Sequence, residues 1–352
     1  MAKARCDAHH GSVMILRRFP LGGSPWPTVD PFLFIAYHLD DYPEGGENLG
    51  PDPALLRDHL IGQDFGNPAG WNMYHGEVVP GFPAHPHRGF ETVTYVRRGI
   101  CDHADSLGAA ARFGRGDTQW LTAGGGIVHS EMFPLLEREK KNPLELFQIW
   151  LNLPAADKYA DPHFRIFWSE ETPKRTQVSE SGARAELVVI AGAIGDEEPL
   201  DPPPSSWASR PNSDVAIWHL ELEEGASIEL PTARLASEGT RRIAYFFEGE
   251  EVRIGEEVLR SGEGAELDPS APVVIRAEEG GASLIILQGK PIGEPVAHYG
   301  PFVMNDDEGL RRAFTDYQRT RFGGWPWSSE APVHDREGRF ARYPDGRIER
   351  RD

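Results

Sequence analysis

Short strand-like runs dominate this chain of 352 residues and restrict the folds open to it. They are rich in Val, Ile, Phe, Tyr and Trp and are bounded by Gly, Pro or Asp, the pattern typical of β-strands. The 38 Gly and 30 Pro residues supply many turns between short elements. The chain is therefore expected to be all-β. The runs are Phe32–His38, Glu91–Val96, Leu146–Leu153, Phe164–Trp168, Ala185–Ala191, Val215–Leu222, Ile243–Phe247, Val273–Ala277 and Ser283–Gln288.

Only two segments favour a helix. One is Pro53–Leu60, which is short. The other begins near Asn305, which forms an N-cap and capping-box-like pair with Glu308, and it should end before Gly323.

Two segments are expected to lie outside the packed elements. The tract 195–213 is rich in Pro, Ser and acidic residues, which predicts a connection between domains or an exposed loop. The tail after Trp327 alternates charges with Gly and Pro and is expected on the surface, although Phe340 and Tyr343 could dock.

A weak internal repeat links the two halves of the chain. Val93–Gly99 resembles Ile243–Gly249, with Tyr four residues before Gly in both, and Gly116–Leu121 resembles Gly262–Leu267. Together with the density of strands, the repeat predicts two related antiparallel β-barrels that arose by duplication.

Charge and cysteine content exclude several classes of protein. The net charge of −19 opposes a general role in binding nucleic acid or an anionic membrane. Cys6 and Cys101 are too few for a disulfide framework or a Cys-rich zinc site. The N-terminus has no apolar signal region, and the longest apolar stretch, Leu187–Ile194, is too short to span a bilayer. A soluble cytoplasmic protein is expected.

Two histidine segments have the spacing of a metal site. Residues i and i+2 of a strand share a face, so His85 and His87 can point at one centre, and so can His129 and Glu131. The second pair follows Gly124–Gly126, a run that allows a tight turn. Three imidazoles and one carboxylate suit iron, manganese, nickel, copper or zinc.

Several blocks of the chain resemble the pirins, a family within the cupin superfamily of small β-barrels. The blocks are His85-Pro-His-Arg-Gly-Phe-Glu-Thr-Val-Thr-Tyr95, Asp105-Ser-Leu-Gly108, Gly116-Asp-Thr-Gln-Trp-Leu-Thr-Ala-Gly-Gly-Gly-Ile-Val-His-Ser-Glu131, Phe147-Gln-Ile-Trp-Leu-Asn-Leu-Pro154, Gly300-Pro-Phe-Val-Met-Asn305 and Asp316-Tyr-Gln318.

The resemblance implies two stacked cupin barrels with a C-terminal helix and tail, and iron, Fe(II) or Fe(III), in the first barrel only. Residue by residue, the implied ligands are His85, His87, His129 and Glu131. The expected domains are a metal-binding barrel at 1–160, crossover strands and a linker at 161–213, and a second barrel with helix and tail at 214–352.

The chain departs from typical pirins in two places. The stretch from Tyr37 to Asn72 is longer than the matching part of the family, which predicts a different entrance to the site. The second barrel matches poorly between Pro199 and Ala236.

Three further residues have open roles. Glu91 is the rival carboxylate ligand, because many other cupins use a glutamate at about this distance after His-x-His and because His85, His87 and Glu91 differ by even numbers. The pirin pattern favours Glu131 and leaves Glu91 a supporting role. Cys101, His103 and Asp105 form an alternating trio that is either a second metal site, a support for the first site, or one polar face of a strand before a turn. We favour the polar face, with His103 the residue nearest the pocket. Gln148 either projects into the cavity or packs internally.

The resemblance to bacterial pirins implies an activity like that of quercetin 2,3-dioxygenases. Three imidazoles and one carboxylate leave two positions of an octahedral metal for a phenolic substrate and O2, and Glu131 could take the substrate's proton. The alternative is a non-enzymatic iron protein that senses redox state or regulates through a protein partner.

Overall fold

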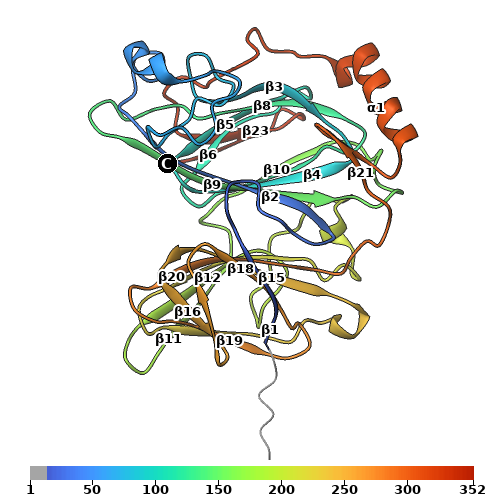
Figure 1. The fold of residues 1–352 in the computed structure, drawn as a ribbon. Coiled ribbons are helices and arrows are strands. Elements are labelled where there is room, and N and C mark those ends of the chain that lie inside the picture. Colours follow the sequence, from blue (N-terminus) through green and yellow to red (C-terminus); the bar gives the residue numbers. More distant parts are fainter. Residues whose placement is uncertain (1–13) are drawn as a thin grey trace, which may run out of the picture. The chain divides into compact units, whose positions relative to one another are not determined.

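The computed structural model describes residues 14–352, so Cys6 lies outside the described part. The chain divides into two compact units (Figure 1). We call residues 23–173, 199–213 and 291–352 the histidine unit, and residues 14–22, 174–198 and 214–290 the apolar unit. The sequence-based domains 1–160, 161–213 and 214–352 are contiguous stretches and stay a prediction.

The histidine unit contains a five-stranded and a six-stranded antiparallel sheet, together with a two-stranded pair and the helix α1 (Asp307–Thr320). The five-stranded sheet has the order β10 (His163–Phe167), β7 (Thr118–Thr122), β4 (Phe90–Arg98), β9 (Asn142–Asn152) and β2 (Phe32–Tyr42). The six-stranded sheet has the order β24 (Ile348–Arg351), β23 (Arg339–Arg342), β6 (Ala110–Gly114), β5 (Ile100–Asp105), β8 (Ile127–Met132) and β3 (Gly81–His87). The remaining elements are β21 (Ala297–Tyr299), β22 (Phe302–Met304) and the 3-10 turns η1 (Pro53–Asp58), η2 (Trp207–Ser209) and η4 (Arg321–Gly323).

The apolar unit also contains two antiparallel sheets, which enclose a core of aliphatic side chains that includes Ile228, Ile254 and Ile275. The seven-stranded sheet has the order β1 (Ile15–Pro20), β18 (Glu263–Leu267), β15 (Arg241–Gly249), β20 (Ala282–Gly289), β13 (Ala216–Leu222), β12 (Arg184–Ala191) and β11 (Lys174–Val178). The other has the order β14 (Ser227–Leu230), β19 (Val273–Ala277), β16 (Glu251–Ile254) and β17 (Glu257–Arg260), and η3 spans Ala236–Glu238.

The all-β prediction is confirmed, since each of the strand-like runs coincides with a strand over all but at most one residue. The repeat also has a structural meaning. In the histidine unit Tyr95 of β4 lies opposite Thr118 of β7, and in the apolar unit Tyr245 of β15 lies opposite Gly264 of β18. The repeated segments are therefore the same strand pair, in the same register, in both units.

The expected helices differ in detail from the observed ones. The segment Pro53–Leu60 forms only the 3-10 turn η1. The helix α1 is present, but its N-cap is Asp306, whose carboxylate accepts a hydrogen bond from the Gly309 N–H at 2.7 Å. The prediction of Asn305 as the cap was wrong by one position, because the Asn305 side chain instead donates to Glu294 and to the Pro295 carbonyl.

Two segments expected at the surface are partly buried. In the tract 195–213, Ser206 is fully buried and its hydroxyl donates to Glu91 at 2.6 Å. The tail supplies β23 and β24, and β23 pairs with β6 through Phe340 opposite Arg112. The docking of Phe340 and Tyr343 is confirmed, and the expectation that the tail only lies on the surface is wrong.

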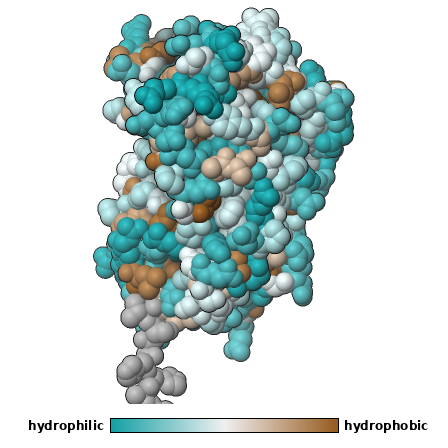
Figure 2. All heavy atoms as spheres, turned by 90° about the vertical axis from the view of Figure 1, so that its right-hand side faces the viewer, coloured by the Kyte–Doolittle hydropathy of each residue, from teal (hydrophilic) through white to brown (hydrophobic). Residues whose placement is uncertain are grey.

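Apolar side chains are mainly inside both units. On the face shown in Figure 2, brown hydrophobic residues lie in small groups among hydrophilic ones. No helix within residues 14–352 combines the length and the apolar character needed to cross a bilayer.

Candidate metal centre

The neighbouring strands β3 and β8 bring three histidines together. His85 lies directly opposite His129 in the antiparallel register, and His87 shares the face of His85. The ring centroids lie 4.4 Å apart for His85 and His129 and 4.8 Å apart for each pair that includes His87. One nitrogen of each ring lies within 4.8 Å of the others, which is compatible with a shared ion.

The hydrogen bonds and burial of these rings fit a metal. The His85 Nδ1–H donates to the Pro83 carbonyl at 2.8 Å, which leaves its Nε2 as an electron-pair donor. Both ring nitrogens of His129 and the Nε2 of His87 are buried without a hydrogen-bond partner among residues 14–352. Such atoms are costly in a folded protein unless a ligand satisfies them.

Burial also keeps the three imidazoles neutral. It lowers the pKa of His85 to about 4 and lowers the pKa values of His87 and His129 well below the usual range. Neutral rings present the lone pairs that a metal ion needs.

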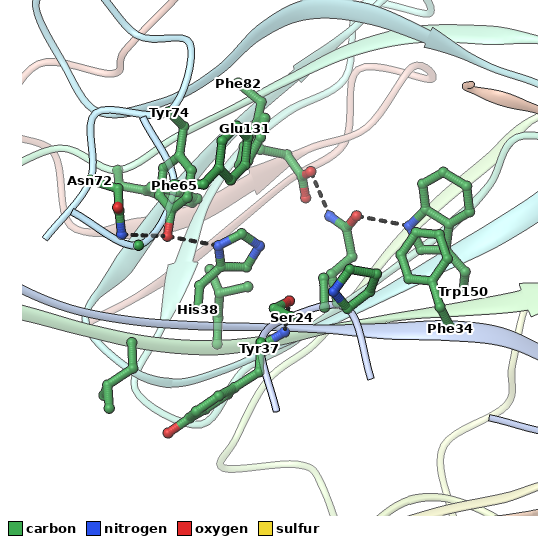
Figure 3. A pocket seen from close by; sticks show the side chains of 18 of the residues that line it. Ser24, Phe34, Tyr37, His38, Phe65, Asn72, Tyr74, Phe82, Glu131 and Trp150 are labelled. Atoms are coloured by element: carbon green, nitrogen blue, oxygen red, sulfur yellow. Dashed lines mark hydrogen bonds between the residues drawn. The ribbon is translucent and has the colours of Figure 1, made fainter. Parts of the chain in front are cut away.

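Glu131 lies next to this histidine cluster on β8. Its Oε2 is 3.9 Å from the His129 Nε2 and accepts a hydrogen bond from the Gln148 Nε2–H at 2.6 Å. The hydroxyl of Thr94 donates to its other oxygen at 3.2 Å, and the indole N–H of Trp150 donates to Gln148 at 3.0 Å (Figure 3). Burial raises the pKa of Glu131, and the His103 charge and these hydrogen bonds oppose that shift. Gln148 therefore projects into the cavity, one of the two roles that the sequence left open.

Glu91 lies on the other face of β4. It is three positions from Thr94, which contacts Glu131, and residues an odd number apart point to opposite faces of a strand. Its carboxylate accepts hydrogen bonds from Trp120, Thr122 and Ser206. The even spacing does not put Glu91 on the face of the histidines, because β3 ends at His87 and the chain turns at Gly89, where φ is +87°, before β4 begins.

His103 lies beside the histidine cluster without lining the cavity. On β5 it is opposite Glu131, and its ring centroid is 5.6 Å from that of His129. Its Nε2 is 3.1 Å from an oxygen of Asp105, whose other oxygen accepts the N–H groups of Leu107 and Ala109 in the turn that follows. This arrangement fits the polar strand face before a turn that we favoured.

His85, His87 and Glu131 line a cavity of about 680 Å³, within the usual size of ligand sites, and His129 lies buried behind them. Its other lining side chains are mostly aromatic or apolar. They include Phe34, Phe65, Tyr74, Phe82, Phe133, Leu146 and Trp150. The long stretch from Tyr37 to Asn72 supplies part of the wall, including His38 and Phe65. That the entrance differs from those of typical pirins stays a prediction.

The sequence argument did not single out His38, Asp40 or Tyr74. The alternation of His38 and Asp40 along one strand, the spacing that drew attention to His85 and His87, was available as a signal. Tyr74 carries no such signal, because it comes from a separate loop.

Comparisons with known proteins agree with the fold. The Pirin family matches residues 21–151, and the pirin C-terminal cupin domain matches residues 217–323. A Pseudomonas aeruginosa protein named provisionally as a quercetin 2,3-dioxygenase is 34% identical over 289 residues, which cover 82% of this chain and 92% of that protein. The pirin of Mus musculus is 31% identical over 286 residues, 77% of this chain and 83% of its own.

One solved structure extends the comparison of the fold. A quercetin 2,3-dioxygenase from Acinetobacter baumannii matches with a TM-score of 0.66 and 24% identity, over 88% of this chain and 96% of its own. The chain thus has two cupin domains, as the resemblance implied.

Proposed function

The chain belongs to the pirin family, and on that premise we propose that it is a metal-dependent dioxygenase that acts on a flavonol-like phenolic substrate. The observation that carries the proposal is the convergence of three imidazoles beside an aromatic-lined cavity. Two of them, those of His87 and His129, are buried and have ring nitrogens with no hydrogen-bond partner among the described residues. Relatives named as quercetin 2,3-dioxygenases support the substrate class.

We propose His85, His87, His129 and Glu131 as the residues that hold the metal, with iron in preference to manganese, nickel, copper or zinc. Bound iron would supply the redox chemistry that brings dioxygen and the phenolic oxygen together.

The protein's own groups would prepare the substrate for this chemistry. Glu131 accepts the proton of the substrate hydroxyl, because its carboxylate lies at the cavity beside the proposed ligands. Gln148 fixes the position of the Glu131 Oε2 through its hydrogen bond. The rings of Phe34, Phe82 and Phe133 exclude water and orient a planar substrate.

Oxygen uptake with quercetin tests the proposal. Iron-loaded protein should consume O2 and open the flavonol ring, and chelation should abolish both. His129→Ala should lose turnover, whereas His163→Ala, on β10 and outside the cavity lining, should keep it. Zinc-loaded protein should stay folded and inactive, because zinc has no accessible redox chemistry. If iron-loaded protein consumes no oxygen across a broad phenolic panel, the proposal fails.

A further inference from the structure

A second hydrogen-bonded group lines the same cavity and has no part in the mechanism above. The His38 Nδ1 lies 2.8 Å from the Tyr74 oxygen, and the Tyr74 hydroxyl donates to the Asp40 Oδ2 at 2.7 Å. Asn72 holds the other oxygen of Asp40 with its backbone N–H at 2.8 Å and its side-chain N–H at 2.7 Å. The three groups form a chain from a buried carboxylate to an imidazole at the cavity wall.

The direction of these hydrogen bonds fixes the tautomer of His38. Asp40 accepts every hydrogen bond that it makes, so the Tyr74 proton lies toward Asp40. The Tyr74 oxygen must then accept from the His38 Nδ1–H, because its own proton is already used. A neutral imidazole protonated at Nδ1 carries a lone pair on Nε2.

That lone pair faces the cavity. Figure 3 shows one His38 nitrogen bonded to Tyr74 and the other directed away from it, and no hydrogen bond to Nε2 is present within the described residues. The rings of Tyr74, Phe82 and Phe133 surround the imidazole, at centroid distances of 4.9, 5.7 and 6.4 Å. Burial keeps the ring neutral by lowering the pKa of His38 to about 4.

The backbone holds Tyr74 in a conformation that costs energy. Its φ is +55°, in the left-handed region that an aromatic residue rarely adopts. Strain of this kind persists where the surrounding structure requires it, and it often marks a functional site. Here it places the Tyr74 hydroxyl between His38 and Asp40.

His38 is near the histidine cluster and separate from it. A single ring, Phe82, packs at 5.7 Å from His38 and at 6.3 Å from His85. A planar aromatic ligand bound at the histidine cluster can therefore pack on Phe82 and contact His38 at its other end.

We propose that His38 is a specificity-determining residue, whose Nε2 accepts a hydrogen bond from a substrate hydroxyl remote from the metal-binding oxygens. Tyr74 and Asp40 are positioning residues that fix the acceptor tautomer. The proposal rests on the proposed function. It predicts that planar phenols with additional, remote hydroxyl groups bind better than phenols whose only oxygens are those that bind the metal.

Binding of two ligands tests the proposal without turnover. Quercetin and 3-hydroxyflavone share a skeleton and the 3-hydroxyl and 4-oxo groups, but 3-hydroxyflavone lacks the remote hydroxyls. Dissociation constants are measured by calorimetry on full-length protein with its metal, under anaerobic conditions. The preference for quercetin over 3-hydroxyflavone should fall by about three- to tenfold in His38→Phe, the loss expected for one neutral hydrogen bond.

Three further variants distinguish the loss of the hydrogen-bond acceptor from a change in the shape of the cavity wall. His38→Gln retains an acceptor and should keep most of the preference. Tyr74→Phe removes the partner of the His38 Nδ1 and should give an intermediate preference. His163→Phe, outside the cavity lining, should behave as the parent protein does.

The outcomes distinguish this proposal from the one on which it rests. An unchanged preference in His38→Phe, with both ligands still bound, overturns the role of His38 and leaves the dioxygenase proposal standing. If neither ligand binds the parent protein, both proposals fail.

Discussion

At the scale of single residues, the difference between Glu131 and Glu91 lies in their partners. Glu91 accepts hydrogen bonds from three side chains and shares none with the histidines. Within the described residues, Glu131 accepts two from side chains and lies beside His129, whose ring nitrogens make no hydrogen bond there. The spacing of His85 with His87 could be read from the sequence. The partners of each carboxylate could not, because Ser206 comes from a distant segment.

We expect Glu131→Ala to reduce bound metal sharply, because it removes the proposed anionic ligand from a buried site. Glu91→Ala should reduce metal affinity less, by at most about 10–100-fold, the range for residues that act through a ligand. Elemental analysis after dialysis against a weak chelator measures both. A greater loss of metal in Glu91→Ala than in Glu131→Ala would give the ligand role to Glu91.

At the scale of elements, alternation predicts which residues share a face only while a strand continues. It worked for His85 with His87 on β3, whereas the strand pair repeated in the two units was found from the spacing of Tyr and Gly. It failed across the corner at Gly89. The pairing of β23 with β6 could not be predicted from the sequence either, because this short charged strand has no apolar alternation that would identify it.

Glu91 links β4 and β7 to the segment 199–213 through hydrogen bonds. Its titration should make the stability of the folded protein depend on pH. Burial raises the pKa of Glu91 from its usual 4.5 to about 7. The folded state thus holds this proton more tightly, so the contribution of Glu91 to stability is largest below pH 4.5 and is lost as pH rises toward 7.

Compared with Glu91→Gln, the parent protein should therefore lose stability between pH 5 and pH 7, by about 1.4 kcal/mol per pH unit at most. Thermal unfolding of the two proteins at matched pH values measures the difference. A difference that does not change with pH would show that Glu91 has the same pKa in the folded and unfolded chain.

At the scale of the whole molecule, the two units share strand register but differ inside. The first pair of repeated segments is 150 residues apart, and this shift takes His85 and His87 to Leu235 and Ser237 in the apolar unit. The second pair is 146 residues apart, and this shift takes His129 to Ile275, which is fully buried in the core of that unit. Within residues 14–352, the only cluster of potential ligands found is that of His85, His87 and His129. The two units thus share the same strand pairing, but the positions of the histidines in one unit are taken by other residues in the other.

We expect one tightly bound metal ion per chain, held in the histidine unit. Metal analysis of purified protein should give a ratio near one, and the double variant His85→Ala/His129→Ala should give a ratio near zero. Two ions per chain, or full occupancy in the double variant, would place a metal elsewhere in the chain.

The order of segments along the chain has a consequence for synthesis. The histidine unit begins at residue 23, yet its six-stranded sheet takes its last two strands from residues 339–351. Because β23 and β24 follow every strand of the apolar unit along the chain, a nascent chain has made all of those strands before it can complete this sheet.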